Sequence, residues 1–574
     1  MGDNDRASVA TRPWARTLEV VALAVPVVAY FWFIGTYAVN VIYYDSWSDI
    51  FLIANESSLW AQHNENRLLF PNILVLLQSD TTHFNIVFEE FLSGAMLVAA
   101  TGLFIGAHKR RSPSTPWLYY FPVLLVMLSF VQAGNTLWGF QLAWYLVMLA
   151  LAATIFIIDR PTLTRMELLA AIVVAVVGSL SSLQGLLIWP VGLVLLWHRR
   201  RTRGFLYAWS ASAVITGALY FSGFDFAASH SNTSYLLSNP IAGLRTFFFV
   251  IGDVFGGKIA DNNGDFIPNA PQASIGLVIA LGIVLFAIAL WVMVFYGLRR
   301  DDVSGRPVGA AMVIFGILYV LTIVVGRASP SSTSGGASRY TTFTLLIIAG
   351  CYLSLLSRPR ARTTPSERGQ PDLTTKSTYL IVRWTLLAAV CLLVVLGSLV
   401  GIDFGRYWHQ REEVMADVTV NLDKVSNHTL DTYVFPGGAQ YVRSGAQIAA
   451  KRHLSLFATG AVSHYSKEGL FKELTAVQVR VVKPSANATL SGTQDFYAAA
   501  SSPIGLTKVQ FRLTGGALHG VTIATGGPLF YGWVARWNSK SVANGRYSLQ
   551  CVAYAYNGKV TDSPGVVVTV KNPG

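Results

Sequence analysis

Charged residues are scarce in this chain. Only 13% of its 574 residues are Asp, Glu, Lys or Arg, whereas 53% are hydrophobic. A soluble globular domain carries about 25% charged residues. The composition therefore excludes an ordinary soluble domain and predicts a polytopic helical membrane protein.

Cysteine is also rare. The chain has three, of which Cys351 and Cys391 fall in apolar stretches and Cys551 falls in a stretch with the pattern of a β-strand. Three isolated cysteines supply neither a disulfide framework nor a thiolate metal cluster. We expect all three to be packing residues.

Long apolar stretches, by contrast, recur between Leu18 and Gly401. A helix needs about 20 such residues to cross a hydrocarbon core about 30 Å thick. The first stretch is too long for a cleaved signal peptide, so we predict a retained helix. We predict eleven crossings, at about residues 18–42, 85–107, 117–133, 137–158, 166–182, 184–198, 205–222, 273–297, 308–326, 341–357 and 380–401. Almost no loop joins the fifth and sixth, so a re-entrant pair is the alternative there.

Lys and Arg are distributed unevenly over the loops between these stretches. With the N-terminus in the cytoplasm, the cytoplasmic segments up to Arg383 carry 21 basic residues and the opposite loops carry five. Basic loops stay on the cytoplasmic side of the inner membrane, and an odd number of crossings places everything after Gly401 outside. Because this asymmetry explains most of the net charge of +13, we expect no nucleic acid as a partner.

The rest of the chain changes in character twice, so we divide the protein at residues 1–401, 402–470 and 471–574. Residues 402–470 are polar, which predicts an extracytoplasmic helical stalk or linker. Residues 471–574 contain short alternating stretches separated by turn residues, the pattern of a small β-sandwich. The arrangement of GPLFYGWVARWN, then NGRYSLQCVAY, then VVVTVKN resembles bacterial Ig-like modules. We expect the tryptophans of the first segment in the sandwich core, with stacking on a sugar as the alternative.

Acids, arginines and an imidazole gather in the loops predicted to face outward. The first of these loops, residues 43–84, contains the sequences YYDSW and HNENR. Its residues of interest are Asp45, Trp47, Asp49, His63, Glu65 and Arg67. A later loop, GRASPSSTSGGASRY, has Arg327 and Arg339 near its ends and closes with Tyr340. The long loop 223–272 places Arg245 in a stretch typical of an interfacial helix.

Sugar transfer from a lipid-linked donor needs these groups at a membrane surface. A carboxylate takes the proton of an acceptor hydroxyl as that hydroxyl attacks the anomeric carbon. A guanidinium neutralises the phosphate that leaves, because its planar set of donors matches phosphate oxygens. The loops therefore predict a glycosyl-transfer site at the outer face.

This architecture resembles the membrane-embedded GT-C class of glycosyltransferases. The shared features are an acid in the first outer loop directly after helix one, about eleven crossings, a long outer loop with an interfacial helix, and a C-terminal soluble domain outside. The resemblance covers residues 18–401 and depends on architecture more than on a strict motif. Members often have two adjacent acids in the first loop, but Ser46 follows Asp45 here, so Asp49 is the candidate second acid.

The resemblance implies a role for each candidate. Asp45 is the catalytic base, with Asp49 as the second acid. The donor phosphate is assigned to Arg67, His63, Arg327 and Arg339. Contacts with the rest of the substrates are assigned to Trp47, Glu65, Tyr340 and Arg245. No cofactor is expected; a divalent metal is compatible with the class but is not indicated by these residues.

Structural alternatives exist for several of these residues. Asp45 could cap a loop helix, and Arg67 could pair with Glu65. Glu89 and Glu90 lie one or two turns inside the second predicted helix, where a carboxylate is costly enough to suggest a role. Snorkelling of these two side chains to the interface is their structural alternative.

The expected function is transfer of one sugar, with inversion, from a polyprenyl-phosphate donor to a glycan, lipid or protein acceptor of the bacterial cell envelope. The expected location is the inner membrane, with membrane lipids as further partners. A transporter or flippase for a lipid-linked glycan is an alternative, and so is a polymerase or ligase that uses a pyrophosphate-linked glycan. A third alternative is a protein that only anchors the Ig-like module at the cell surface. One crossing would be enough for that purpose, so eleven predicted crossings disfavour it.

Overall fold

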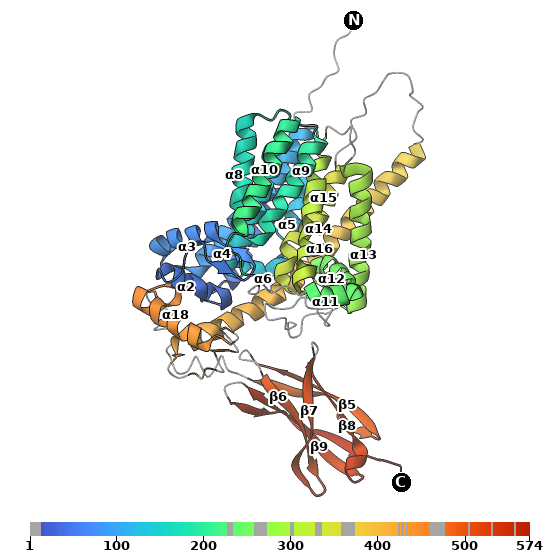
Figure 1. Cartoon of the computed structure of the whole chain (residues 1–574). Coiled ribbons are helices and arrows are strands. Elements are labelled where there is room, and N and C mark those ends of the chain that lie inside the picture. The colour runs from blue at the N-terminus through green and yellow to red at the C-terminus, as the bar shows by residue number, and fades with distance from the viewer. Residues whose placement is uncertain are drawn as a thin grey trace.

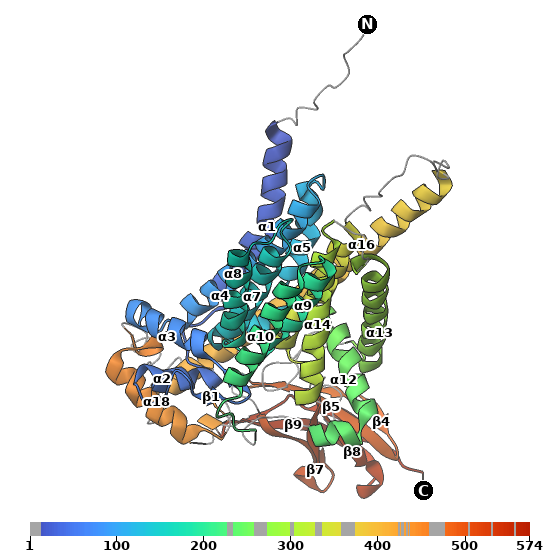
Figure 2. The same cartoon turned by 45° about the horizontal axis from the view of Figure 1, so that its top comes forward.

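A computed structural model describes residues 13–226, 233–257, 273–298, 304–327, 336–356, 373–458 and 477–573, apart from short gaps at 423–424, 426, 428–429, 432–433, 436, 503–505, 530–531 and 556–557. The chain has a helical part followed by a strand part at its C-terminal end (Figure 1). The first helix begins at the end of the helical part that lies away from the strands (Figure 2).

The N-terminal half of the helical part contains a small hairpin and many helices. Its elements are α1 (Pro13–Tyr37), η1 (Tyr44–Ser46), α2 (Trp47–Ile53), β1 (Gln62–His63), β2 (Asn66–Arg67), α3 (Leu69–Thr82), α4 (Ile86–Arg111), η2 (Trp117–Tyr120), α5 (Phe121–Met127), η3 (Phe130–Gln132), α6 (Ala133–Thr136), η4 (Gly139–Gln141), α7 (Leu142–Ile158), α8 (Arg165–Ser179), η5 (Leu183–Leu187), α9 (Ile188–His198) and α10 (Arg203–Tyr220).

The second half of the helical part ends in a helix that follows the last crossing. Its elements are α11 (Thr233–Ser238), α12 (Pro240–Gly252), η6 (Asp253–Phe255), α13 (Ile275–Val292), η7 (Met293–Gly297), α14 (Arg306–Arg327), η8 (Ser338–Tyr340), α15 (Thr341–Leu356), α16 (Leu373–Val420), α18 (Ala439–Arg452) and η10 (Ser455–Phe457).

Eight helical segments of the described residues are long and apolar enough to cross a membrane. They are Arg16–Tyr37, Ile86–Arg111, Trp117–Thr136, Gly139–Ile158, Ile275–Gly297, Arg306–Arg327, Ser338–Leu356 and Cys391–Val420. The three other predicted crossings correspond to α8, α9 and α10. α8 and α9, with 15 and 11 residues, are shorter than the roughly 20 residues that a full crossing needs. α10 has 18 residues but is not apolar enough to count as a candidate span. The count of eleven is therefore not confirmed.

The helices of this part approach one another closely where glycines meet. A side chain at Gly309 of α14 would collide with the carbonyl of Gly350 in α15, and the reverse holds for Gly350. Small residues at such crossings let helix backbones pack directly in an apolar bundle. As a result α15 is buried along most of its length.

A buried acid and several arginines join three helices at the end where the first helix begins. Asp159, which follows α7, is 0% exposed. Its carboxylate lies 2.6 Å from Arg199 Nη2 after α9 and 3.4 Å from Arg111 Nε at the end of α4. Arg199 Nη2 also donates to the carbonyl of Ser304. We name Asp159, Arg111 and Arg199 the basic-end cluster; it fixes the ends of these helices relative to each other.

The boundary predicted at residue 401 falls inside a helix. α16 runs without interruption from Leu373 to Val420, a length of 48 residues, and crosses the whole helical part (Figure 1). The chain then turns back, and α18 packs against α2 at the end of the helical part that is opposite the basic-end cluster (Figure 1). Residues 402–458, so far as they are described, belong to the helical part rather than to a separate stalk.

The strand part is an antiparallel structure with one parallel pair. Its elements are β3 (Gln478–Lys483), β4 (Ala488–Leu490), β5 (Thr493–Ser501), β6 (Leu506–Gly515), β7 (Leu518–Leu529), β8 (Gly532–Asn538), η11 (Ser539–Ser541), β9 (Gly545–Ala555), β10 (Val560–Asp562) and β11 (Val566–Val570). The strand order is β3-β5-β8-β7-β6-β9-β11-β4, with β10 paired to β9. Trp537 is 6% exposed and packs on Phe496 in the core, as expected for a core tryptophan.

Candidate functional site

An acid–imidazole pair lies directly after the first helix. Asp45 is in η1, and a two-residue hairpin of β1 and β2 brings His63 Nε2 to 3.4 Å from Asp45 Oδ1. Burial alone would lower the pKa of His63, but the nearby carboxylate of Asp45 raises it overall. The imidazolium–carboxylate pair therefore persists to higher pH than usual and is lost as the pH rises through this raised pKa.

Arg67 fixes the hairpin that carries His63. This guanidinium donates to three backbone carbonyls, those of Trp60 at 2.7 Å, Ser222 at 2.8 Å and Tyr220 at 3.3 Å. The Tyr220 hydroxyl in turn donates to the carbonyl of Glu65 at 2.7 Å. Arg67 is 4% exposed, so this geometry favours a structural role over the predicted contact with phosphate.

Two arginines converge on one phenol opposite the hairpin. The Tyr340 hydroxyl accepts from Arg327 Nε at 2.9 Å and from Arg339 Nη2 at 3.2 Å. Arg327 Nη2 also lies 3.8 Å from Glu65 Oε1, so Glu65 pairs with Arg327 and not with Arg67. Arg327 lies at the end of α14, and Arg339 and Tyr340 lie in η8.

An aromatic wall connects the two groups. Arg339 lies over the Trp138 ring at 5.6 Å, and Trp138 stacks on Phe140 with ring centroids 5.9 Å apart. Phe140 contacts the His63 ring at 5.0 Å. We name Trp138 and Phe140 the aromatic wall. Nothing in the sequence GNTLWGFQ, which contains both rings, marks them as neighbours of His63.

Three other predicted residues are placed differently. Trp47 is 0% exposed and lies in the protein core, where it cannot contact a substrate. Asp49 is 4% exposed and lines an internal cavity. Arg245 lies on the exposed side of α12 beside Leu244, which fits an interfacial helix, and among the described residues it has no recorded ion pair with the other candidates.

The segment after α16 covers the loop that carries Asp45. Tyr44 stacks on Phe435 at 5.0 Å and Phe51 stacks on Tyr441 at 4.4 Å. Arg452 Nη1 donates to the carbonyl of Ile53 at 2.8 Å. The backbone of η1 and α2 is thus fixed by α18 and the residues just before it, which sequence analysis assigned to a stalk.

Gly445 is expected to be essential for this contact. A Cβ atom at Gly445 would come within 2.8 Å of the Trp47 ring, so Gly445→Leu should lower the free energy of unfolding by about 1–3 kcal/mol through overpacking. Thermal unfolding in nanodiscs would measure the change. Ser444→Leu, on the exposed side of α18, is the matched control, and equal stability of the two variants would contradict the close contact.

No group of three His, Cys, Asp or Glu side chains within the described ranges is arranged to hold a metal ion. The site as described consists of the Asp45–His63 pair, the aromatic wall, and Tyr340 between two arginines. This arrangement places a carboxylate and a concentrated positive charge at the two ends of the aromatic wall, in which Trp138 is buried and Phe140 is half-buried. It lies at the end of the helical part opposite the basic-end cluster.

Comparison with known proteins assigns the strand part. Residues 478–550 match the family model of a bacterial Ig domain. Similar solved structures include the fibronectin(III)-like modules of Clostridium thermocellum CbhA, with 24% identity over 16% of this chain and 96% of that one and a TM-score of 0.14. Another is an engineered protein, with 16% identity over 24% of this chain and 28% of that one and a TM-score of 0.14.

No curated protein matches the chain, and no glycosyltransferase family model matches it. The family match covers the strand part and leaves the helical part to be interpreted from its residues. The chain therefore joins a helical part with eight candidate membrane spans, counted over the described residues, to a C-terminal bacterial Ig domain.

Proposed function

We propose that the protein is an integral-membrane glycosyltransferase that moves a sugar from a polyprenyl-phosphate donor to a glycan, lipid or protein acceptor of the cell envelope. The observation that carries the proposal is that Asp45 with His63, and Arg327 with Arg339, lie along one aromatic wall. Its setting is the bacterial inner membrane, with the N-terminus in the cytoplasm and the Ig domain outside.

Each group then has one role in transfer. The acceptor hydroxyl attacks the anomeric carbon while the Asp45 carboxylate takes its proton. His63 holds the Asp45 carboxylate in place. The bond from the anomeric carbon to the phosphate oxygen breaks, and the electron pair stays on the phosphate. Attack from the face opposite the leaving phosphate inverts the anomeric centre.

The two arginines stabilise the leaving phosphate. Their guanidinium groups already converge on one oxygen, the Tyr340 hydroxyl, and charge-assisted contacts with phosphate are stronger than those with a phenol. Phe140, which is half-buried, offers an apolar face against which a sugar ring can pack. The donor lipid would stay in the bilayer beside the helices.

Transfer of labelled sugar tests the proposal directly. Purified protein in nanodiscs is incubated with a panel of radiolabelled polyprenyl-phosphate sugars and an envelope extract. Label that moves from one donor into the extract supports the proposal. Binding of a donor lipid without transfer, or movement of the intact lipid between leaflets, would instead indicate a transporter; transfer from pyrophosphate-linked glycans alone would indicate a polymerase or ligase.

Removing either arginine should weaken use of the donor. A hydrogen bond to a charged group contributes about 1.5–3 kcal/mol, so Arg327→Ala or Arg339→Ala is expected to lower kcat/KM for the donor by about 10- to 150-fold. Initial transfer rates over a range of donor concentrations give this ratio. Arg406→Ala is the control, because Arg406 is exposed on α16 and pairs only at the surface with Asp403; an equal loss in all three variants would contradict the assignment.

A further inference from the structure

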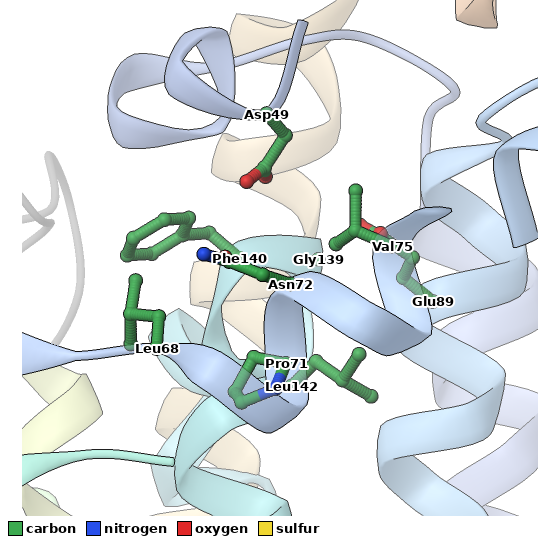
Figure 3. A pocket seen from close by; sticks show the side chains of 9 residues that line it. All are labelled: Asp49, Leu68, Pro71, Asn72, Val75, Glu89, Gly139, Phe140 and Leu142. Carbon is green, nitrogen blue, oxygen red and sulfur yellow. The ribbon is translucent and has the colours of Figure 1, made fainter. Parts of the chain in front are cut away.

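A small cavity lies behind the aromatic wall. It is lined by polar groups from α2, α3 and α4 and by apolar side chains around them (Figure 3). The lining residues are Asp49, Leu68, Pro71, Asn72, Val75, Glu89, Gly139, Phe140 and Leu142. The cavity has space for roughly one water molecule or one hydroxyl group. Phe140 separates it from His63.

Glu89 turns one bare carboxylate oxygen toward this cavity. The side chain is 1% exposed, so it does not snorkel to the interface. Its Oε1 atom accepts from Gln78 Nε2 at 2.8 Å, whereas Oε2 is buried without a hydrogen-bond partner among the described residues. Oε2 lies directly against Gly139, where any side chain would collide with it. Gly139 therefore leaves room for this oxygen.

Asp49 reaches the same cavity from α2 (Figure 3). The charged or titratable groups that face it are Asp45 of η1, His63 of β1, Glu89 of α4 and Tyr441 of α18. Burial raises the pKa of Asp49 to about 7; the positive charge of His63 opposes this increase and the negative charge of Asp45 adds to it. Asp49 therefore exchanges its proton near neutral pH.

We propose that Asp49 and Glu89 share one proton and bind one hydroxyl group of the carbohydrate acceptor in this cavity. Two ionised carboxylates in one enclosed space repel each other strongly, and a shared proton removes that cost. The pair then has both a donor and acceptors, which is what a hydroxyl group needs. This inference rests on the proposed glycosyl transfer and gives that site its means of acceptor recognition.

The donor set favours a hydroxyl group over a metal ion. A divalent cation such as Mg²⁺ or Ca²⁺ takes six or more oxygen ligands. Here the cavity offers two carboxyl groups and Asn72, whose Nδ2 already donates to the carbonyl of Leu59 at 3.3 Å. The remaining lining is apolar apart from backbone. A single hydroxyl group matches this small number of polar atoms.

Infrared spectroscopy after a pH jump tests the shared proton without any substrate. Below neutrality both carboxyl groups carry a proton, and above it the pair keeps one, so the protonated carboxyl band of the parent should weaken through neutrality without vanishing. Asp49→Asn should abolish the part that titrates near neutrality, and Glu89→Gln should remove the part that persists above it. Glu90→Gln is the matched control, because Glu90 is equally buried but does not line the cavity; it should leave the titrating part unchanged. A titrating part that survives in Asp49→Asn, or a persistent part that is unchanged in Glu89→Gln, would overturn the shared proton.

Transfer kinetics test the bound hydroxyl group. Glu89→Gln keeps the shape of the side chain, and we expect it to raise KM for the acceptor about 10-fold or more while KM for the donor stays unchanged. Gly139→Ala should have the same effect, because its methyl group displaces the Glu89 carboxylate without removing charge. An unchanged KM for the acceptor would overturn acceptor binding at this cavity. So would a dependence of the parent's activity on divalent cations that both variants lack.

The infrared experiment and the kinetic experiment together separate this inference from the proposed function. If no donor supports transfer, the proposed function fails, yet the infrared band and its changes in the two cavity variants still report on the carboxyl pair. Addition of envelope glycans should then shift the band in the parent alone if the cavity binds a sugar hydroxyl. No shift with any glycan would overturn the hydroxyl site.

Discussion

Asp45→Asn should lower the rate of sugar transfer by about 10²–10⁴-fold, the usual contribution of a general base. The amide keeps the size of the side chain but cannot take the proton of the acceptor hydroxyl. Because the proposal assigns the donor phosphate to Arg327 and Arg339, KM for the donor should change little. The loss should therefore fall on kcat.

Single-turnover transfer in nanodiscs measures this effect once the donor is known. The control is Asp80→Asn, since Asp80 is an exposed acid on α3 that follows Asp45 in the same predicted outer loop. Normal elution on size exclusion and an unchanged helical circular dichroism spectrum would show that Asp45→Asn is folded. Full activity of the folded variant would remove Asp45 from the role of base.

Asp159→Ala should lower the free energy of unfolding by about 3–5 kcal/mol. Asp159 is fully buried and binds Arg199 and Arg111. Without its carboxylate, the Arg199 side chain, which is 6% exposed, loses the anion that lies 2.6 Å from it. Removing one partner of a buried ion pair has a cost of this size, because the remaining charge loses its counter-ion in a site with little water.

Unfolding in mixed micelles, followed by tryptophan fluorescence, gives the change in free energy. The matched control is Asp403→Ala. Asp403 also pairs with an arginine, Arg406 at 3.2 Å, but both side chains are exposed, so the loss should stay below about 1 kcal/mol. Similar losses in the two variants would show that the basic-end cluster contributes no more than a surface pair.

The features that sequence predicted best are those that depend on local pattern. Apolar length predicted helices at α4, α13 and α14, and alternation predicted β3, β6, β9 and β11. Asp45 and His63 lie in one loop of the sequence, and Arg327, Arg339 and Tyr340 lie near the ends of another. The proximity within each group could therefore be predicted. Whether these residues act in transfer stays a prediction.

Contacts between distant segments were not predictable in this way. Trp47 and Arg67 have the composition of binding residues, and only their burial shows that their side chains are engaged by the protein itself. The packing of α18 on α2 had one weak signal in the sequence, a stripe of small residues on α18. These are Ala439, Val442, Gly445, Ala446 and Ala449, all buried, but a stripe of this kind does not identify its partner.

The contact between α18 and the first outer loop also sets when the site can form during synthesis. Arg452 binds the carbonyl of Ile53, a residue 399 positions earlier in the chain. At about 5–20 residues per second, a ribosome needs on the order of 20–80 s to make the intervening segment. Throughout that time the loop with Asp45 has been made but lacks its cover. On the proposed function and topology, we therefore expect a nascent chain to show no transfer until α16 has been inserted and the residues beyond it have been exported.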